Sequence, residues 1–232
     1  MKKIHNDIIS SEGSMFLIDK PPGYTSARVV NIVKKYAHVT KAGHCGTLDP
    51  RATGLLIICT GRKTRELSNF LNADKEYEGV MEIGSVTDSF DSETAVRKTA
   101  STDHITTELI NETARSFIGE TEQIPPMYSA VKYKGKPLYR LARKGVEIER
   151  PKRKVVVKKF DITYFRNPEI GFRILCSKGT YIRSIINDFG LKLGTGAYLK
   201  ELRRTKIGNM DVKDSVTVDE FIRMYSPQKV TG

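Results

Sequence analysis

The sequence lacks any apolar run long enough to cross a lipid bilayer. Its longest uninterrupted apolar stretch is LLIIC, residues 55–59, whereas a membrane-spanning helix needs about 20 apolar residues. The N-terminal stretch MKKIHNDIISSEG carries lysines but no apolar core of the kind that defines a secretory signal. We therefore expect a soluble, cytoplasmic protein with no membrane partner.

Cysteine and histidine are scarce, which narrows the possible chemistry. The three cysteines are far apart without a CxxC pair, and the four histidines are scattered. This pattern argues against a zinc ribbon, a disulfide framework or a typical metal site. Cys45 as a nucleophile would need a base, and the side chain of its neighbour His44 is expected to diverge from it. The GxxxxGK[ST] and GxGxxG motifs are also missing, which argues against a nucleotide-binding loop.

Positive charge, in contrast, is abundant. There are 39 lysines and arginines against 27 aspartates and glutamates, a net charge of +12. A surplus of this size favours polyanionic partners, which include RNA, DNA and anionic lipid. Between residues 128 and 144, lysines and arginines are interleaved with tyrosines, a combination that suits a nucleic-acid backbone with unstacked bases. Each basic residue alone is better explained as part of a solvated face, but the whole set together with the net charge favours nucleic-acid binding.

The hydrophobic periodicity predicts an α+β fold, because the expected strands do not alternate regularly with the expected helices. Strands are predicted at residues 15–19, 54–61, 77–84 and 170–176, and another strand runs from the basic segment at 150–159 to Tyr164 with a bulge between Val157 and Phe160. Helices are predicted from Thr25 or Ser26, over 105–118, between Pro137 and Gly145, and over 180–193. The last of these is predicted to end at Gly194 and to bury one stripe of apolar side chains: Ile182, Ile185, Ile186, Phe189 and Leu193. The polar residues 86–104 are predicted to form a surface loop.

Two charged residues raise a question of function. Asp49 lies in the loop GHCGTLDPRATG, residues 43–54, where an aspartate before Pro50 is ordinary turn chemistry. Arg183 lies in the first turn of the last long helix, where the helix dipole favours negative charge by about 0.3–1 kcal/mol. Arg183 is therefore either a solvated side chain that tolerates this cost or a partner for a buried anion. A carboxylate such as that of Asp49 would suit its guanidinium.

Six segments, in order along the chain, resemble motifs of the TruB-type pseudouridine synthases. They are LIDKPPGYTS (17–26), KAGHCGTLDPRATGLLIICTGRKTR (41–65), DKEYEG (74–79), IPPMYSAVKYKGKPLYRLARKGVEIER (124–150), CSKGTYIRSIINDFG (176–190) and GAYLKELRRTKIG (196–208). The resemblance implies the pseudouridine synthase fold, in which a mixed, mostly antiparallel central sheet has flanking helices and an RNA-binding cleft. It also implies one catalytic domain over residues 1–232, with its core at about 14–210.

The same resemblance implies a role for each matching residue. Asp49 corresponds to the catalytic aspartate, Arg183 to the arginine that pairs with it, and Tyr77 to the tyrosine that stacks on the target uracil and is implicated in removing the C5 proton. The implied substrate-binding residues are His44, which fills the space left by the flipped base, Leu202, which contacts that base, and Tyr181, Lys20 and Arg203. Lys20 also corresponds, with Pro21, to residues that brace the catalytic loop.

The implied activity is the isomerisation of uridine to pseudouridine in tRNA, at uridine 55 of the TΨC loop, after the base is flipped out. This reaction consumes no electrons, water or phosphate, so no cofactor or metal is expected, and the T stem-loop of tRNA is the expected partner, without an obligate protein partner. One alternative is a non-catalytic RNA-binding or tRNA-folding module, and another is a related synthase that modifies a different RNA.

This sequence departs from the family pattern in two places. Residues 211–232 are too few for the PUA-like RNA-binding domain found in many members, and are predicted to be a short tail with one strand and one helix. RNA binding is then expected to be weaker or more sensitive to salt. Cys45 occupies a position where threonine or serine is common, and its small side chain is expected to preserve the loop.

Overall fold

The computed structural model describes residues 12–226, which form two compact units. Unit 1 contains the chain up to Glu76 and again from Arg203, and unit 2 is Tyr77–Leu202. Two strands, β4 (Lys75–Ile83) and β12 (Ala197–Ile207), run from one unit into the other. The expectation of one catalytic domain over the whole chain stays a prediction.

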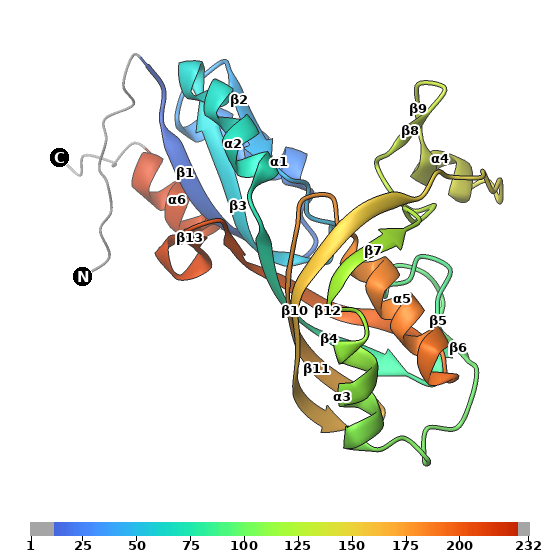
Figure 1. Ribbon diagram of the computed structural model, residues 1–232. Helices are drawn as coiled ribbons and strands as arrows, with labels where there is room; N and C mark the ends of the chain where they lie inside the picture. The colour runs from blue at the N-terminus through green and yellow to red at the C-terminus, as the bar shows by residue number, and fades with distance from the viewer. Residues whose placement is uncertain (1–11, 227–232) are drawn as a thin grey trace. The chain divides into compact units, whose positions relative to one another are not determined.

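Unit 1 is built around β3 (Thr53–Thr60), which has neighbours along both edges (Figure 1). One edge pairs antiparallel with β1 (Met15–Lys20), which in turn pairs with β14 (Val216–Thr217). The other edge is shared: β2 (Ala42–Cys45) covers its second half, and β12 takes over in parallel at Thr53 and Gly54. A short strand, β13 (Met210–Asp211), pairs with the end of β12.

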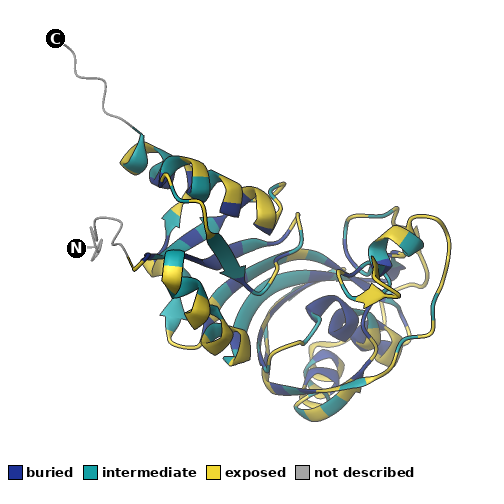
Figure 2. Ribbon diagram, turned by 90° about the horizontal axis from the view of Figure 1, so that it is seen from above, coloured by how far each residue is buried: buried dark blue, intermediate teal, exposed yellow. Residues whose placement is uncertain are grey.

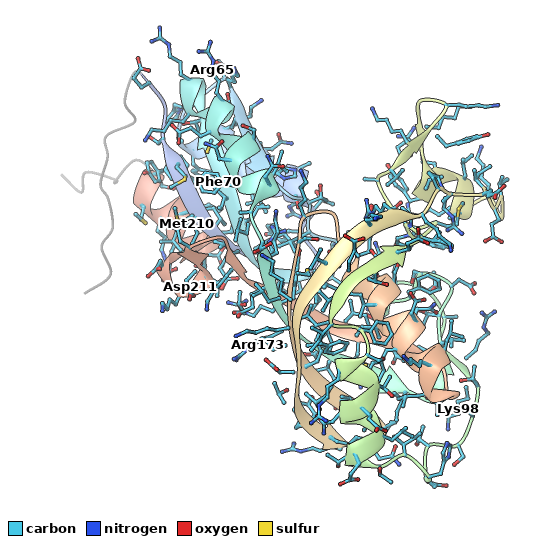
Figure 3. All side chains as sticks on the ribbon, viewed as in Figure 1. Arg65, Phe70, Lys98, Arg173, Met210 and Asp211 are labelled. Atoms are coloured by element: carbon cyan, nitrogen blue, oxygen red, sulfur yellow. The ribbon has the colours of Figure 1, made fainter. Side chains whose placement is uncertain are left out.

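The two faces of β3 are both buried, which explains its continuous apolar sequence. Leu56 and Ile58 pack against α1 (Ser26–Tyr36) and α6 (Val218–Tyr225). Leu55, Ile57 and Cys59 face the opposite way, where the side chains of Phe70 and Met210, both labelled in Figure 3, cover them. Phe70 belongs to α2 (Leu67–Asn72), which follows the 3₁₀ turn Gly61–Glu66.

The sheet of unit 2 has the strand order β12-β4-β11-β10-β7. The long β10 (Arg153–Arg166) pairs antiparallel with both β11 (Glu169–Cys176) and β7 (Gly119–Gln123). The helices α3 (Thr107–Arg115) and α5 (Ile182–Leu193) share one apolar cluster with this sheet, so both cover the same face of it (Figure 1). The buried stripe of α5 is the one predicted from the sequence, and Gly194 ends the helix at φ 75°.

Smaller features complete unit 2. The hairpin of β8 (Lys132–Tyr133) and β9 (Lys136–Pro137) leads into α4 (Leu138–Ala142). The hairpin is exposed, whereas α4 is mostly of intermediate burial (Figure 2). The strands β5 (Ser85–Val86) and β6 (Arg97–Lys98) form a second two-stranded ribbon.

The α+β prediction is confirmed, since the strands pair mostly antiparallel, with parallel pairs at β1–β14 and β3–β12. The register of β10 against β11 shifts between Val157 and Lys159, so the predicted bulge is confirmed. The surface loop predicted at 86–104 is wrong in part: residues 85–98 contribute a ribbon, and Thr87, Ser89 and Asp91 are buried. The predicted final strand and helix are β14 and α6, and residues 227–232 of the predicted tail lie outside the described residues.

Within residues 12–226, none of the helices combines the length and the apolar composition that crossing a bilayer would require.

Candidate active site

Asp49 lies on the loop that connects β2 to β3, at the point where the edge of β3 changes partner. β2 pairs with β3 as far as Cys45 and Ile57, and β12 pairs with it at Thr53 and Gly54. The intervening residues 46–52 leave the sheet between these two partners. The backbone N–H of Ala52 donates to the carbonyl of Asp49 (3.1 Å), which closes the predicted Asp-Pro turn.

The residues on each side of Asp49 are held by hydrogen bonds. The hydroxyl of Ser26 donates to the carbonyl of Leu48 (3.2 Å) and accepts from its N–H (3.0 Å). The carbonyl of Pro50 accepts from the N–H of Gly23 (2.8 Å) and from the Lys20 ammonium (3.1 Å). Because both flanking peptides are fixed, the Asp49 carboxylate is carried on a rigid turn.

Arg204 holds the two ends of the same loop together. Its side chain is fully buried, and its guanidinium donates from Nε to Leu55 O (2.8 Å) and from Nη2 to Gly46 O (3.0 Å). β12 comes so close to β3 that a Cβ on Gly54 would lie 2.3 Å from the carbonyl oxygen of Arg204, and Gly54 has a φ of +100°. Glycine is therefore required at this position.

Lys20 is a buried cation next to the Asp49 loop. Its ammonium donates to the carbonyls of Pro21 (3.0 Å), Tyr24 (2.7 Å) and Pro50 (3.1 Å), so all three N–H groups have acceptors. Burial lowers the pKa of Lys20 to about 8; Asp49 opposes this shift and Arg204 adds to it. The predicted bracing role of Lys20 therefore agrees with its contacts, and its charge attracts the Asp49 carboxylate.

Two other predicted residues of unit 1 have specific environments. His44 lies on β2, its Nδ1 is buried without a hydrogen-bond partner among residues 12–226, and burial and then Arg204 lower its pKa. Both effects favour the neutral form of the imidazole. Arg203 makes a two-pronged ion pair with Asp19 (3.0 and 2.6 Å), so a role in substrate binding would have to share its guanidinium with this carboxylate.

In unit 2, Arg183 is buried in the first turn of α5. Its guanidinium donates to the carbonyls of Ser89 (3.0 Å) and Tyr128 (2.8 Å), and its Nε lies 3.5 Å from the Asp91 carboxylate. Only 4% of the side chain is exposed. The solvated-arginine alternative is therefore wrong, because the guanidinium is buried beside the Asp91 carboxylate. The predicted partner, Asp49, is a different residue, and that pairing stays a prediction.

Asp91 belongs to this network although the sequence pattern around it does not indicate a buried site residue. It accepts hydrogen bonds from the Ser89 hydroxyl (2.6 Å) and the Glu93 N–H (2.9 Å), and it is nearly as buried as Arg183. The backbone beside it bridges to β12 through the Leu199 N–H and the Phe90 carbonyl (2.9 Å). An acidic residue in a Ser- and Thr-rich stretch is typical of a surface turn, so only the distant arginine reveals its burial.

The remaining predicted residues of unit 2 are Tyr77, Leu202 and Tyr181. Tyr77 on β4 and Leu202 on β12 are partly buried and pack against the same apolar cluster. Tyr181 immediately precedes α5, and its backbone N–H and carbonyl are both bound by the side-chain amide of Gln123.

Each unit thus gathers part of the predicted site. Unit 1 holds Asp49, Lys20, His44 and Arg203, and unit 2 holds Arg183, Tyr77, Tyr181 and Leu202. The pairing of Asp49 with Arg183 and the RNA-binding cleft stay predictions. Among residues 12–226, no group of three or more His, Cys, Asp or Glu side chains is arranged to hold a metal ion.

Comparison with known families gives two matches that together cover most of the chain. The TruB family pseudouridylate synthase (N terminal domain) matches residues 34–182, and the tRNA pseudouridylate synthase B C-terminal domain matches residues 183–230. A tRNA pseudouridine synthase B from Chloroherpeton thalassium is 48% identical over 219 residues, which is 92% of this chain and 91% of the relative. One from Flavobacterium johnsoniae is 47% identical over 218 residues, covering 90% and 95% of the two chains.

Solved structures also contain chains that resemble this one. An archaeal box H/ACA sRNP Nop10–Cbf5 complex contains a chain that aligns with a TM-score of 0.69 at 28% identity, over 97% of this chain and 57% of that one. A chain in an H/ACA RNP bound to a substrate RNA containing 2′-deoxyuridine aligns with a TM-score of 0.68 at 28% identity, over 94% and 59%. This chain spans less than two thirds of those structural relatives. The two sequence relatives, each matched over more than nine-tenths of its length, and the two family matches show that the chain belongs to the TruB family of pseudouridylate synthases.

Proposed function

We propose that this chain converts uridine to pseudouridine in tRNA, at position 55 of the TΨC loop, with Asp49 as the catalytic carboxylate. The reaction and its tRNA substrate follow from membership of the TruB family and from relatives named tRNA pseudouridine synthase B that are covered over more than nine-tenths of their length. Because its substrate is tRNA, we assign the protein to the cytoplasm, and we expect no obligate protein partner.

The observation that carries the assignment of Asp49 is that buried side chains hold the backbone of its loop through hydrogen bonds. Ser26, Lys20 and Arg204 are all buried, and each donates at least one hydrogen bond to a backbone carbonyl of residues 46–55. Buried polar side chains that hold one partly exposed loop are typical of a loop whose exact geometry matters for chemistry. A carboxylate held in this way can meet a flipped uridine with little reorganisation.

The isomerisation itself is balanced within the substrate. The N1–C1′ bond breaks, the uracil turns, a C5–C1′ bond forms, and the C5 proton leaves as N1 gains one. Asp49 would act as the nucleophile at C6 or at C1′, or as the base that removes the C2′ proton to give a glycal. Each of these roles requires an ionised carboxylate, which the neighbouring Lys20 ammonium favours.

Tyr77 and Arg183 would complete the site. We assign Tyr77 to the uracil ring and to removal of the C5 proton, and Leu202 to an apolar contact with the same base. We assign Arg183 the role of pairing with the Asp49 carboxylate. Asp91 and two backbone carbonyls keep the plane of the Arg183 guanidinium fixed. His44, whose neutral form is favoured, would fill the space that the flipped base leaves.

Tritium release tests the proposal directly. Unmodified tRNA labelled with tritium at uracil C5 should lose the label on incubation with the wild-type protein. Asp49→Asn should lower the rate by about 10²-fold or more, since a positioned general base contributes about 10²–10⁴-fold. Asp103→Asn, a change in an exposed loop, should leave the rate unchanged.

Two results would count against the proposal in different ways. If the wild type binds tRNA without releasing tritium, the chain is an RNA-binding or tRNA-folding module. If Asp49→Asn keeps the wild-type rate, the reaction stands and the assignment of Asp49 is wrong. Mapping the modified nucleotide then tests position 55 separately from the reaction.

A further inference from the structure

Arg153 is placed in a way that works against stability. It is the first residue of β10, and its guanidinium Nε and Nη2 are shielded from solvent without a hydrogen-bond partner among residues 12–226. Every N–H that loses water without gaining an acceptor destabilises the folded state. The ion pairs at this end of the strand are made instead by its neighbours, Lys152 with Glu122 and Lys154 with Glu120.

The contact that Arg153 does make is with the ring of Tyr181. The guanidinium carbon lies 4.4 Å from the ring centroid, within the range of a cation–π interaction. Such a contact gains less than two buried, unpaired N–H groups cost. The ring also lies at the N-terminus of α5, where the helix dipole disfavours a cation. Stability alone therefore does not explain an arginine at this position.

The backbone of Tyr181 is fixed by the residue opposite Arg153. Gln123, the last residue of β7, pairs with Arg153 across the sheet. Its buried side-chain amide accepts from the Tyr181 N–H (2.7 Å) and donates to the Tyr181 carbonyl (3.0 Å). The paired ends of β7 and β10 thus hold Tyr181 twice, its backbone through Gln123 and its ring through Arg153.

We propose that Arg153 is a positioning residue that presents the ring of Tyr181 to a nucleotide of the tRNA. This inference rests on the proposed function, because it takes Tyr181 as a substrate-binding residue. With one face against a guanidinium and its backbone clamped, the ring has little freedom left to lose when a nucleotide packs against it. Aromatic rings are the usual support for unstacked RNA bases. Arg183 lies two residues further on, so the same anchor also fixes the start of the helix turn that carries it.

The variant Arg153→Met tests this role, because it keeps the length of the stem and removes the charge together with the unpaired N–H groups. We expect a melting temperature equal to or above that of the wild type, and a single-turnover rate at saturating tRNA that falls about tenfold, the effect of a small misplacement of a substrate-binding group. Arg153→Lys, which keeps the cation, should recover part of that rate. The matched control is Arg166→Met, at the exposed far end of the same strand, whose guanidinium lies 5.6 Å from the Tyr164 ring; its rate should not change.

A double-mutant cycle separates this role from others. If Arg153 acts through Tyr181, then Arg153→Met should have no further effect on the rate in a Tyr181→Leu background. The inference is overturned if the two effects add, if Arg153→Met lowers the melting temperature with the rate unchanged, or if it weakens tRNA affinity and its salt dependence alone, as a direct phosphate contact would. A wild type that releases no tritium would instead overturn the proposed function, and this inference with it.

Discussion

Ser26 and Thr25 are adjacent residues with separate tasks, and together they test whether rigidity at Asp49 matters. The Thr25 hydroxyl caps α1 by accepting from the Arg28 N–H (3.1 Å), while the Ser26 hydroxyl bonds both polar groups of the Leu48 peptide. Removing either hydroxyl should lower the unfolding free energy by about 1–2 kcal/mol. Loss of the Thr25 hydroxyl removes a helix cap, and loss of the Ser26 hydroxyl leaves buried polar groups unsatisfied. Only the Ser26 bonds touch the residue next to Asp49.

We therefore expect Ser26→Ala to lower the single-turnover rate roughly tenfold or more, because small displacements of a catalytic group are costly, and Thr25→Ala to leave that rate unchanged. Denaturant melts and tritium release on the same preparations measure the two effects. Equal rates for the two variants would show that the Leu48 clamp serves stability alone.

The lowered pKa of Lys20 gives a second prediction at the residue scale. Above pH 8 its ammonium loses its proton, so it can no longer donate to all three of its carbonyls or attract Asp49. Turnover should decline with an apparent pKa near 8, and the decline should move to higher pH in Lys20→Arg, whose guanidinium stays charged.

Stability should change in the opposite direction over the same pH range. The pKa of Lys20 is about 8 in the folded protein and 10.5 in the unfolded chain, so the unfolded state binds more protons between these values. The contribution of Lys20 to the unfolding free energy therefore rises with pH from about 8 to about 10.5. The difference between wild type and Lys20→Met, measured by denaturant melts at pH 7 and pH 9, isolates this group; a difference that does not change with pH would contradict the lowered pKa.

At the scale of elements, the close pairing of β3 with β12 fixes the point where the Asp49 loop enters β3. Gly54→Ala would place a methyl carbon 2.3 Å from the Arg204 carbonyl oxygen at a φ of +100°, so the strands would have to separate. We expect a loss of about 3 kcal/mol or more in unfolding free energy and a fall in turnover, because Arg204 also binds the loop.

Gly194→Ala is the matched control for this change. Gly194 has a φ of +75° but nothing within 4 Å of an added Cβ, so its cost is the backbone strain alone, about 1–2 kcal/mol. Chemical denaturation of both variants measures the difference. Similar losses would mean that the approach of β12 to β3 is less tight than the Cβ distance indicates.

The elements also show which parts of the fold a sequence can reveal. The bulge in β10 and the buried stripe of α5 could be predicted because each leaves a periodic trace in neighbouring residues. The burial of Ser89 and Asp91 could not, because their local pattern is that of a polar turn and their burial depends on Arg183 in another element. Arg183 could be recognised because a cation in the first turn of a helix opposes the helix dipole, which is a local signal. Asp91, its acidic partner within unit 2, has no local signal of this kind.

At the scale of the whole molecule, the net charge of +12 predicts salt-sensitive tRNA binding, and the exposed β8–β9 hairpin is where we expect much of that charge to act. Lys132 and Lys136 are exposed on this hairpin, whereas Lys152 and Lys154, at the start of β10, already pair with Glu122 and Glu120. Two double variants, one changing each pair of lysines to glutamine, lower the net charge equally. They therefore separate total charge from its position.

If the hairpin binds phosphates, Lys132→Gln with Lys136→Gln should reduce the slope of log Kobs against log salt by about 0.7–0.9 for each lysine–phosphate interaction removed, whereas Lys152→Gln with Lys154→Gln should change it little. Titrations of tRNA at several salt concentrations measure both slopes. Equal reductions would mean that the molecule attracts tRNA through its overall charge. The hairpin would then have no special place in recognition, and Tyr133, which lies between its lysines, would be a surface residue of the kind that any exposed hairpin carries.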